Sequence, residues 1–276
     1  MCRLYGFQAN EPTKIECSLV HAQNALLDQG IQDAAGLTHG HGWGIGVYPD
    51  GIPTVEKKSW AAWHGEHFKK VAARIYSYSV IAHVRRATVG PPSINNTHPF
   101  SHGRWLFAHN GTIHNFDAVR PLMLDATDFM HREEIHGSTD SEHIFRYFLT
   151  LWQQHPERPL RKTMGECIRN ILAWTQDVSP AEPPALNLLL TDGHQMVGSR
   201  LGRTLWFIER DHIHICEICG KSHVDHDPSQ PYKAVEIASE PITHEKWLGV
   251  PDATVFSVDP DVRLHFEDLG DIALSA

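Results

Sequence analysis

Apolar residues recur along the chain with two different spacings, which predict alternating strands and helices. Residues 4–7 form a short apolar run that suits a buried strand. Near-helical spacing predicts helices over residues 12–27 and 63–76, with Gly30 ending the first of them. The pattern then returns to a buried strand over residues 79–84.

The mixture of strands and helices continues to the end of the chain. A turn at residues 49–51 predicts a hairpin, and an apolar helix is predicted to begin at residues 138–142. The remaining predicted elements are hairpin strands 45–48 and 54–59, strand 105–109, helix 164–174, a hairpin of 186–191 and 195–200, and strands 205–209, 233–238 and 254–259. We expect the part beyond residue 150 to be scaffold.

Four glycines alternate with larger residues over residues 40–47. A strand with this pattern has one face without side chains, so another segment can approach its backbone closely.

Composition narrows the class of protein. The 276 residues are enough to bury a full core, and the 41% hydrophobic and 21% charged content is that of a soluble globular protein. The sequence has no apolar run of about 18 residues and no secretory pattern, so we expect a cytoplasmic protein without a membrane partner. Net charge is −9 and basic residues are not clustered, which argues against a nucleic-acid partner.

The chemistry of the chain begins at its second residue. If the initiator methionine is removed, Cys2 carries both a thiol and a free α-amine. An amine with a reference pKa near ~8 is a suitable local base for a thiol nucleophile. The apolar run that follows would hold this terminus in place. On these residues alone, a cysteine present at this position by chance is the alternative.

Polar residues follow the predicted strands 80–84 and 105–109. Arg85 is placed to bind a carboxylate through paired hydrogen bonds, or else to form a surface ion pair. Asn110-Gly111 is a strong hairpin-turn signal, yet an asparagine amide and a glycine N–H also supply two donors for an oxyanion. The two interpretations are compatible, because a tight turn is a rigid platform.

A helix start carries a further candidate. Thr139 and Glu142 have the spacing of a capping box, and Asp140 in the first turn complements the helix dipole. If the Asp140 carboxylate faces a cleft, it can instead hold an ammonium group.

A cluster of possible metal ligands lies late in the chain. Cys216 and Cys219 form a Cys-x2-Cys pair followed by His223 and His226, which are the ligand types of a zinc site. The spacing between the two pairs is tighter than in common zinc motifs, which favours a loop with incidental thiols. The five cysteines, an odd number, argue against a disulfide framework.

Taken together, these motifs resemble the class II glutamine amidotransferases, members of the N-terminal nucleophile hydrolases. The later stretches 187–193 and 238–241 are similar to the single-domain branch that includes the γ-glutamyl hydrolases of ergothioneine synthesis. The motifs that carry the resemblance are Met1-Cys2-Arg3-Leu4, Gly42-Trp43-Gly44, residues 82–90, residues 96–100, His109-Asn110-Gly111 and Thr139-Asp140-Ser141-Glu142.

The resemblance implies an α+β fold with four layers, αββα, in which two antiparallel sheets stack face to face. It implies a single domain over residues 1–276, with the catalytic motifs in 2–150 and scaffold in 151–276. By position, Cys2 would be the nucleophile, and Asn110 with the Gly111 N–H would form the oxyanion hole.

The same resemblance assigns the substrate contacts. Arg85 would bind the α-carboxylate of glutamine and Asp140 its α-ammonium group, while Thr88 and His98 would line or support the pocket. The reaction would pass through a γ-glutamyl thioester on the cysteine, and no cofactor or metal is expected. One departure is His41, where many relatives carry an acidic residue.

The residues leave the fate of the leaving group open. Because all 276 residues are expected to belong to one fold, no acceptor domain is expected. The chain would either pass ammonia to a synthase subunit or act alone on a γ-glutamyl metabolite, such as an ergothioneine intermediate or a glutathione-like compound. A third hypothesis is a non-catalytic amino-acid-binding module, in which Met1 stays in place and blocks Cys2.

Overall fold

The computed structural model describes residues 2–227 and 229–270, in which strands form two antiparallel sheets. The seven-stranded sheet has the order β11-β9-β10-β1-β4-β2-β3, and the six-stranded sheet has the order β13-β12-β8-β7-β6-β5. The first sheet contains β1 (Arg3–Lys14), β2 (Trp43–Val47), β3 (Thr54–Lys58), β4 (Tyr76–Val84), β9 (Trp206–Arg210), β10 (Ala234–Ala238) and β11 (Leu248–Gly249). The second contains β5 (Phe100–His102), β6 (Trp105–Thr112), β7 (Ala185–Thr191), β8 (Met196–Arg200), β12 (Thr254–Val258) and β13 (Leu264–Asp268).

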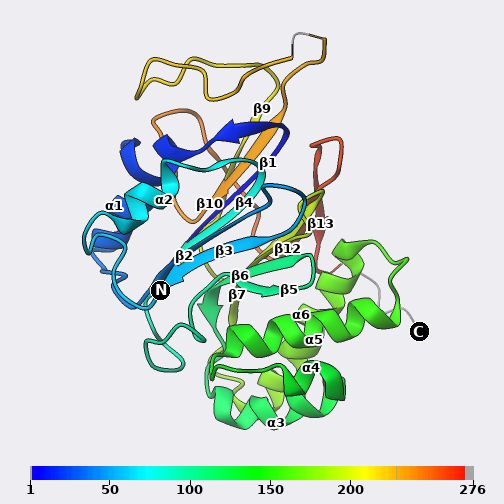
Figure 1. Cartoon of the computed structure of the whole chain (residues 1–276). Helices are drawn as coiled ribbons and strands as arrows, with labels where there is room; N and C mark the ends of the chain where they lie inside the picture. The colour runs from blue at the N-terminus through cyan, green and yellow to red at the C-terminus, as the bar shows by residue number, and fades with distance from the viewer. Residues whose placement is uncertain (1, 228, 271–276) are drawn as a thin grey trace.

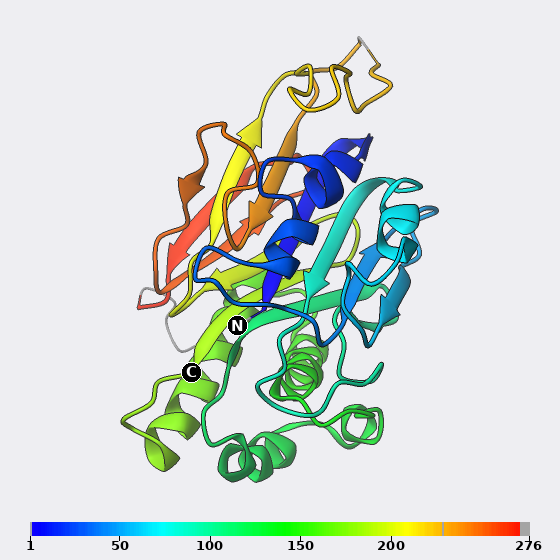
Figure 2. The same ribbon diagram turned by 90° about the vertical axis from the view of Figure 1, so that its left-hand side faces the viewer.

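Helices cover the outer face of each sheet, which gives four layers (Figures 1 and 2). One side carries η1 (Cys17–His21), α1 (Leu26–Ile31) and α2 (His67–Ala72); the other carries α3 (Phe116–Ala126), α4 (Phe129–Glu133), α5 (Asp140–Gln154) and α6 (Leu160–Val178). Successive residues of β1 point to opposite faces: Leu4 joins the core between the sheets, and Tyr5 joins the core under the first helical layer. The predicted α+β, αββα architecture is confirmed.

Both predicted hairpins are present, as β2–β3 and β7–β8. The predicted helix over residues 12–27 is wrong, because β1 continues to Lys14 and pairs there with Tyr76 of β4. Only η1 and α1 remain helical in that region. The helix predicted over residues 63–76 likewise shortens to α2, since Tyr76 already belongs to β4. In both places, long-range strand pairing overrides a local helical pattern.

The glycine-rich strand β2 is approached closely from the second sheet, as its pattern predicts. A Cβ atom on Gly44 would lie 2.2 Å from the His98 carbonyl oxygen, and one on Gly46 would lie 2.7 Å from a Leu106 methyl group. Any larger residue would push the 98–100 segment away. These glycines therefore position His98 at the junction of the two sheets.

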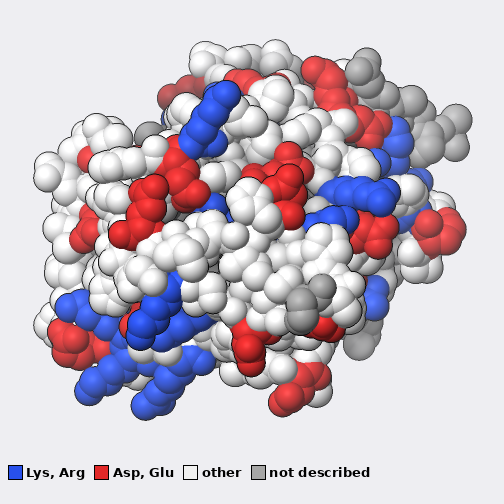
Figure 3. Space-filling view, turned by 90° about the horizontal axis from the view of Figure 1, so that it is seen from above, with Lys and Arg blue, Asp and Glu red and all other residues white. Residues whose placement is uncertain are grey.

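Charged side chains of both signs are distributed over the surface. Figure 3 shows a group of basic side chains at the lower left of the face seen from above, with acidic and further basic side chains across the rest of it. Within residues 2–227 and 229–270, we find no helix with the length and apolar character needed to cross a membrane.

Candidate active site

Cys2 lies where the start of β1 meets the end of β4, two neighbouring strands in the middle of the seven-stranded sheet. Arg3 of β1 pairs with Val84 of β4, so the antiparallel register brings Cys2 opposite Arg85. The Cys2 side chain is buried, and its Sγ accepts the Arg86 N–H at 3.3 Å and lies 3.4 Å from the Arg86 carbonyl oxygen. Strand pairing thus fixes the thiol against the segment that follows β4.

A buried ionic network holds this end of the chain. The Arg3 guanidinium donates to the Cys2 carbonyl at 2.9 Å and lies 2.6 Å from carboxylate oxygens of both Asp33 and Glu240. His39 Nε2 lies 2.8 Å from Asp33 Oδ2. Burial disfavours the charged Asp33 carboxylate, but the Leu37 N–H and the adjacent His39 and Arg3 hold its pKa below the usual value. The network anchors the cysteine backbone, and no local sequence signal singled out Asp33.

One small pocket brings together six of the seven predicted site residues. They come from the start of β1, the β4–β5 segment, the end of β6 and the start of α5: Cys2, Arg85, Thr88, His98, Gly111 and Asp140. Sequence reasoning did not single out the other lining residues, which are Arg86, Val89, His109, Thr139 and Ser141. All five lie inside the motifs that carry the family resemblance, but nothing in the sequence indicates which residues of those motifs face the pocket.

The Arg85 guanidinium is buried and held by backbone carbonyls. It donates to the carbonyl oxygens of Val89 at 2.9 Å, Gly90 at 3.0 Å and Pro91 at 3.2 Å. Burial lowers its pKa, and the nearby Cys2 and Asp140 oppose that shift. Among the described residues, no carboxylate forms an ion pair with it. A buried cation in this state is ready to receive an anionic ligand.

The Asp140 carboxylate is fixed at the N-terminus of α5. Its Oδ2 accepts the Ile113 N–H at 2.8 Å, and its Oδ1 accepts the Ser141 N–H at 2.8 Å. Thr139 caps the helix as predicted, since its hydroxyl accepts the Glu142 N–H at 3.2 Å. The Glu142 carboxylate does not complete a capping box. It accepts backbone N–H groups of residues 136 and 137 instead.

The hairpin-turn interpretation of Asn110-Gly111 is wrong. Both residues lie within β6, where Asn110 pairs with Asn187 and Gly111 with Leu186 of β7. A Cβ atom on Gly111 would lie 1.8 Å from the Ala185 carbonyl oxygen, so this position requires glycine. The rigid platform is therefore a central strand and not a turn.

Asn110, the seventh predicted site residue, is buried and is not among the residues that line the pocket. Its Nδ2 donates to the Ser239 hydroxyl at 3.0 Å, and Ser239 Oγ also accepts the Leu4 N–H at 3.0 Å. Its buried Oδ1 has no partner among the described residues. Ser239 thereby connects the predicted oxyanion-hole amide to β1, the strand that follows the cysteine.

His98 forms an uncharged wall of the pocket. Its ring lies 4.2 Å from that of His83 and 4.8 Å from that of Phe100, and both its ring nitrogens are buried without a partner in the described part of the chain. Burial holds the pKa of His98 well below its usual value. Thr88, at the pocket mouth, lies with its hydroxyl 3.0 Å from that of Thr112.

His41, where the family pattern predicts an acid, also supports the site. The His41 ring Nδ1 accepts the Ala87 N–H at 2.9 Å, and the His41 backbone N–H donates to the Arg85 carbonyl at 2.9 Å. The imidazole therefore ties the glycine-rich loop to the pocket segment.

The electrostatics of the pocket oppose spontaneous ionisation of the thiol. Burial raises the pKa of Cys2, the Arg86 N–H and nearby positive groups lower it, and Asp140 raises it further. A thiol that stays protonated needs a base beside it before it can act as a nucleophile. The α-amine of a processed terminus would be such a base.

Residues 1–262 match the sequence model of a family described as glutamine amidotransferases class-II. The chain belongs to this family. A protein of Saccharomyces cerevisiae named as a probable glutamine amidotransferase is 30% identical over 96% of this chain and 84% of its own length. The γ-glutamyl-hercynylcysteine sulfoxide hydrolase of Mycobacterium tuberculosis (strain H37Rv) is 35% identical over 81% of this chain and 77% of its own length.

Solved structures of class II glutamine amidotransferases share the fold. A class-II domain protein from Silicibacter pomeroyi superposes with a TM-score of 0.65 at 18% identity, covering 97% of this chain and 99% of its own. The glutamine phosphoribosylpyrophosphate amidotransferase of Bacillus subtilis superposes with a TM-score of 0.61 at 16% identity. The match covers 97% of this chain and 49% of that one. Membership of the family makes this chain a hydrolytic or amidotransferase enzyme.

Proposed function

We propose that the chain cleaves the γ-glutamyl amide bond of a small molecule with Cys2 as nucleophile. The observation that carries the proposal is the shared pocket of a buried thiol, the Arg85 guanidinium and the Asp140 carboxylate. A glutamyl head has an α-carboxylate and an α-ammonium group, which are opposite in charge to these two side chains. The two charges therefore bind and orient the head, and the thiol attacks its side-chain carbonyl.

The proposed reaction needs only groups of this chain and water. The α-amine of the processed terminus takes the thiol proton, and the sulfur attacks the carbonyl carbon. The Gly111 N–H and the second N–H of the Asn110 amide, whose other N–H donates to Ser239, stabilise the oxyanion. As the carbon–nitrogen bond breaks, the leaving amine takes the proton back and a γ-glutamyl thioester remains. Water then hydrolyses the thioester to free glutamate and the thiol of Cys2.

A specific observation supports a stand-alone hydrolase as the second candidate function. The similar Mycobacterium tuberculosis protein is named for hydrolysis of a γ-glutamyl metabolite. In this chain, Thr88 and Val89 line both the small pocket and a wider surface groove beside it. That groove has room for a substrate larger than glutamine. Transfer of ammonia to a synthase subunit is the other version, and it uses the same glutamyl pocket.

A substrate panel tests the function. Purified protein is incubated with glutamine, glutathione and other γ-glutamyl amides, and released glutamate is measured. We expect turnover that Cys2→Ala abolishes. Faster turnover of a larger γ-glutamyl compound without any partner supports the stand-alone hydrolase. Full activity of the Cys2→Ala variant would refute the nucleophile assignment.

Mass spectrometry provides an independent test. We expect intact mass to show loss of Met1, and a glutamine-mimicking electrophile to label Cys2 alone. The other four cysteines, Cys17, Cys167, Cys216 and Cys219, are internal controls. Retention of Met1 together with absence of turnover would instead support the binding-module hypothesis.

A further inference from the structure

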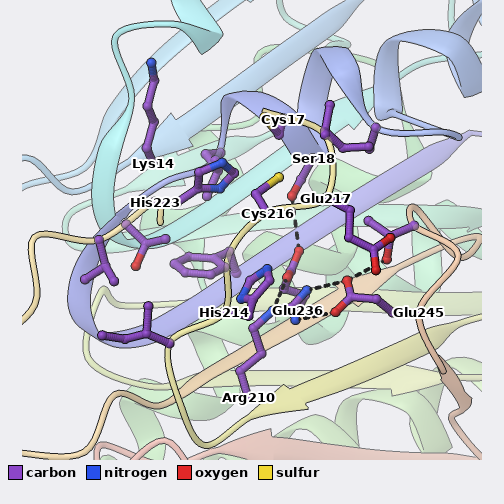
Figure 4. A pocket seen from close by; sticks show the side chains of 18 of the residues that line it. Lys14, Cys17, Ser18, Arg210, His214, Cys216, Glu217, His223, Glu236 and Glu245 are labelled. Atoms are coloured by element: carbon purple, nitrogen blue, oxygen red, sulfur yellow. Dashed lines mark hydrogen bonds and ion pairs between the residues drawn. The ribbon is translucent and has the colours of Figure 1, made fainter. Parts of the chain in front are cut away.

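Three cysteines and a histidine meet at the far end of β1 from the active site. Cys17 belongs to η1, whereas Cys216, Cys219 and His223 belong to the segment between β9 and β10. Their sulfur and ring-nitrogen atoms all lie within 4.8 Å of one another, and the Cys219 sulfur is 3.2 Å from His223 Nε2. Figure 4 shows Cys216 and His223 near Cys17 in the pocket that they line. The proposed reaction uses none of the four residues.

The local backbone holds the ligands of the β9–β10 segment in a closed turn. The Gly220 N–H donates to the Cys216 carbonyl at 2.8 Å, and the Cys216 N–H donates to the Lys221 carbonyl at 3.0 Å. Gly220 has φ +68°, a conformation that glycine adopts without strain. The turn brings the two thiols of the Cys-x2-Cys pair to the same side.

The same segment is attached to the end of β1. The Lys14 N–H donates to the His223 carbonyl at 2.8 Å, and Thr13 forms a β-bridge with Val224. Because Cys17 follows Lys14 by one short turn, these backbone bonds place its thiol beside the loop ligands. Two segments distant in sequence thus present four convergent side chains.

We propose that Cys17, Cys216, Cys219 and His223 bind a structural Zn²⁺ ion. Three thiolates and one imidazole form a soft, four-ligand set that suits tetrahedral zinc. Zinc bonds of ~2.3 Å to sulfur and ~2.0–2.1 Å to nitrogen place neighbouring ligand atoms about 3.5–3.8 Å apart. The spacing in the structure is close to this, so small side-chain movements complete the site. On binding, the three thiols release their protons to solvent.

The ligand set differs from the one that the sequence presented. His226 is not part of it, because its Nδ1 lies 2.8 Å from Glu11 Oε1 instead. Cys17 takes its place, contributed from the other end of the chain. This explains why the tight spacing of the late motif does not rule out zinc: the motif supplies three ligands, and the fold supplies the fourth.

The site would cross-link the long β9–β10 segment to the end of β1. Cys2 lies at the opposite end of that strand. Arg3 pairs with Val84 and Lys14 with Tyr76, so the strand spans the same length as eight residues of β4, roughly 26 Å at ~3.3 Å per residue. We therefore expect the metal to contribute to stability and loop order, with little direct effect on the catalytic step.

Metal analysis of tag-free, full-length protein tests the site. We expect one zinc per chain by elemental analysis, retained through gel filtration. Reduced apoprotein titrated with Co²⁺ should develop thiolate-to-cobalt charge transfer and the visible bands of tetrahedral cobalt. Cys219→Ser should weaken metal affinity by more than about 100-fold, because loss of an outer-shell partner alone costs 10–100-fold. Cys219 is exposed, so this change spares the core.

Matched variants separate metal binding from folding. His226→Ala alters the same segment outside the ligand set and should keep wild-type zinc content, whereas Cys17→Ser should lose it. Circular dichroism checks that each variant is folded. If a variant fails to fold, the cobalt spectrum of wild-type apoprotein decides the question. The proposal is overturned if zinc-supplemented cultures yield metal-free protein whose reduced form gives no thiolate–cobalt band, or if intact mass shows a disulfide among the three cysteines.

Discussion

Replacing Arg85 by glutamine removes the positive charge from the pocket while keeping a polar side chain of moderate length. A guanidinium has five N–H donors, and the backbone carbonyls of residues 89–91 accept three hydrogen bonds from it. At least two donors therefore remain for a substrate. If both contact the α-carboxylate, at about 1.5 kcal/mol or more for each hydrogen bond to a charged group, the lost binding is about 3 kcal/mol.

This free energy corresponds to a decrease of about 150-fold in kcat/KM for glutamine, since about 1.36 kcal/mol is a factor of ten. The loss alone does not identify the contact, because the same side chain holds the 89–91 loop. We therefore pair the variant with a glutamine analogue that lacks the α-carboxylate. With wild-type enzyme, kcat/KM for the analogue should be lower than kcat/KM for glutamine by about the same factor of 150.

The four combinations of enzyme and substrate form a double-mutant cycle, measured by glutamate release or, for the analogue, by ammonia release. With the analogue as substrate, we expect Arg85→Gln to lower kcat/KM only slightly. The coupling energy should therefore be near the full value of about 3 kcal/mol. Thermal unfolding of the variant serves as the folding control. An equal proportional loss for both substrates would show that Arg85 supports the loop and does not bind the carboxylate.

Three further predictions follow from other parts of the structure. Asn110→Ala should lower kcat by about 10²–10³ with little change in KM, as expected for an oxyanion donor, and unchanged kcat in steady-state assays would contradict this role. Arg3→Met leaves two buried carboxylates without their cation and should lower the free energy of unfolding by about 3–5 kcal/mol in urea titrations; a loss below about 1 kcal/mol would mean that the network is not structural. Burial lowers the pKa of His98 well below 6.5, that of His39 to about 4 and that of His83 to about 3. Below about pH 6.5 the unfolded chain therefore binds protons that the folded chain does not, and the free energy of unfolding should fall by about 4 kcal/mol from about pH 7.5 to pH 5.5, as urea denaturation can measure; a flat profile would show that these histidines are protonated when folded.

Much of the candidate site could be predicted, because its members lie in short motifs that are recognised from local sequence. The end of the strand before Arg85 is predicted by apolar periodicity, and the start of the helix at Asp140 is predicted by capping chemistry. The structure gathers both in one pocket with Cys2. The sequence did not predict which motif residues turn inward. It also did not predict the Arg3–Asp33 contact, which joins segments with no local signal between them.

Three errors in local structure have one cause, and the shortened helix over residues 63–76, where Tyr76 joins β4, is one of them. Residues 12–14 follow a helical pattern yet extend β1, and Asn110-Gly111 has the pattern of a turn yet continues β6. In each case a neighbouring strand supplies backbone hydrogen bonds that the local pattern does not reveal.

By itself, the sequence determined the family, the order of the candidate site motifs and the residue types available for chemistry at Cys2. Only the tertiary structure decided that Asn110 belongs to a central strand and that Cys17 joins the thiols of the β9–β10 segment. The physical reason is that periodicity and turn chemistry report interactions over a few residues, whereas sheet pairing brings together side chains from opposite ends of the chain.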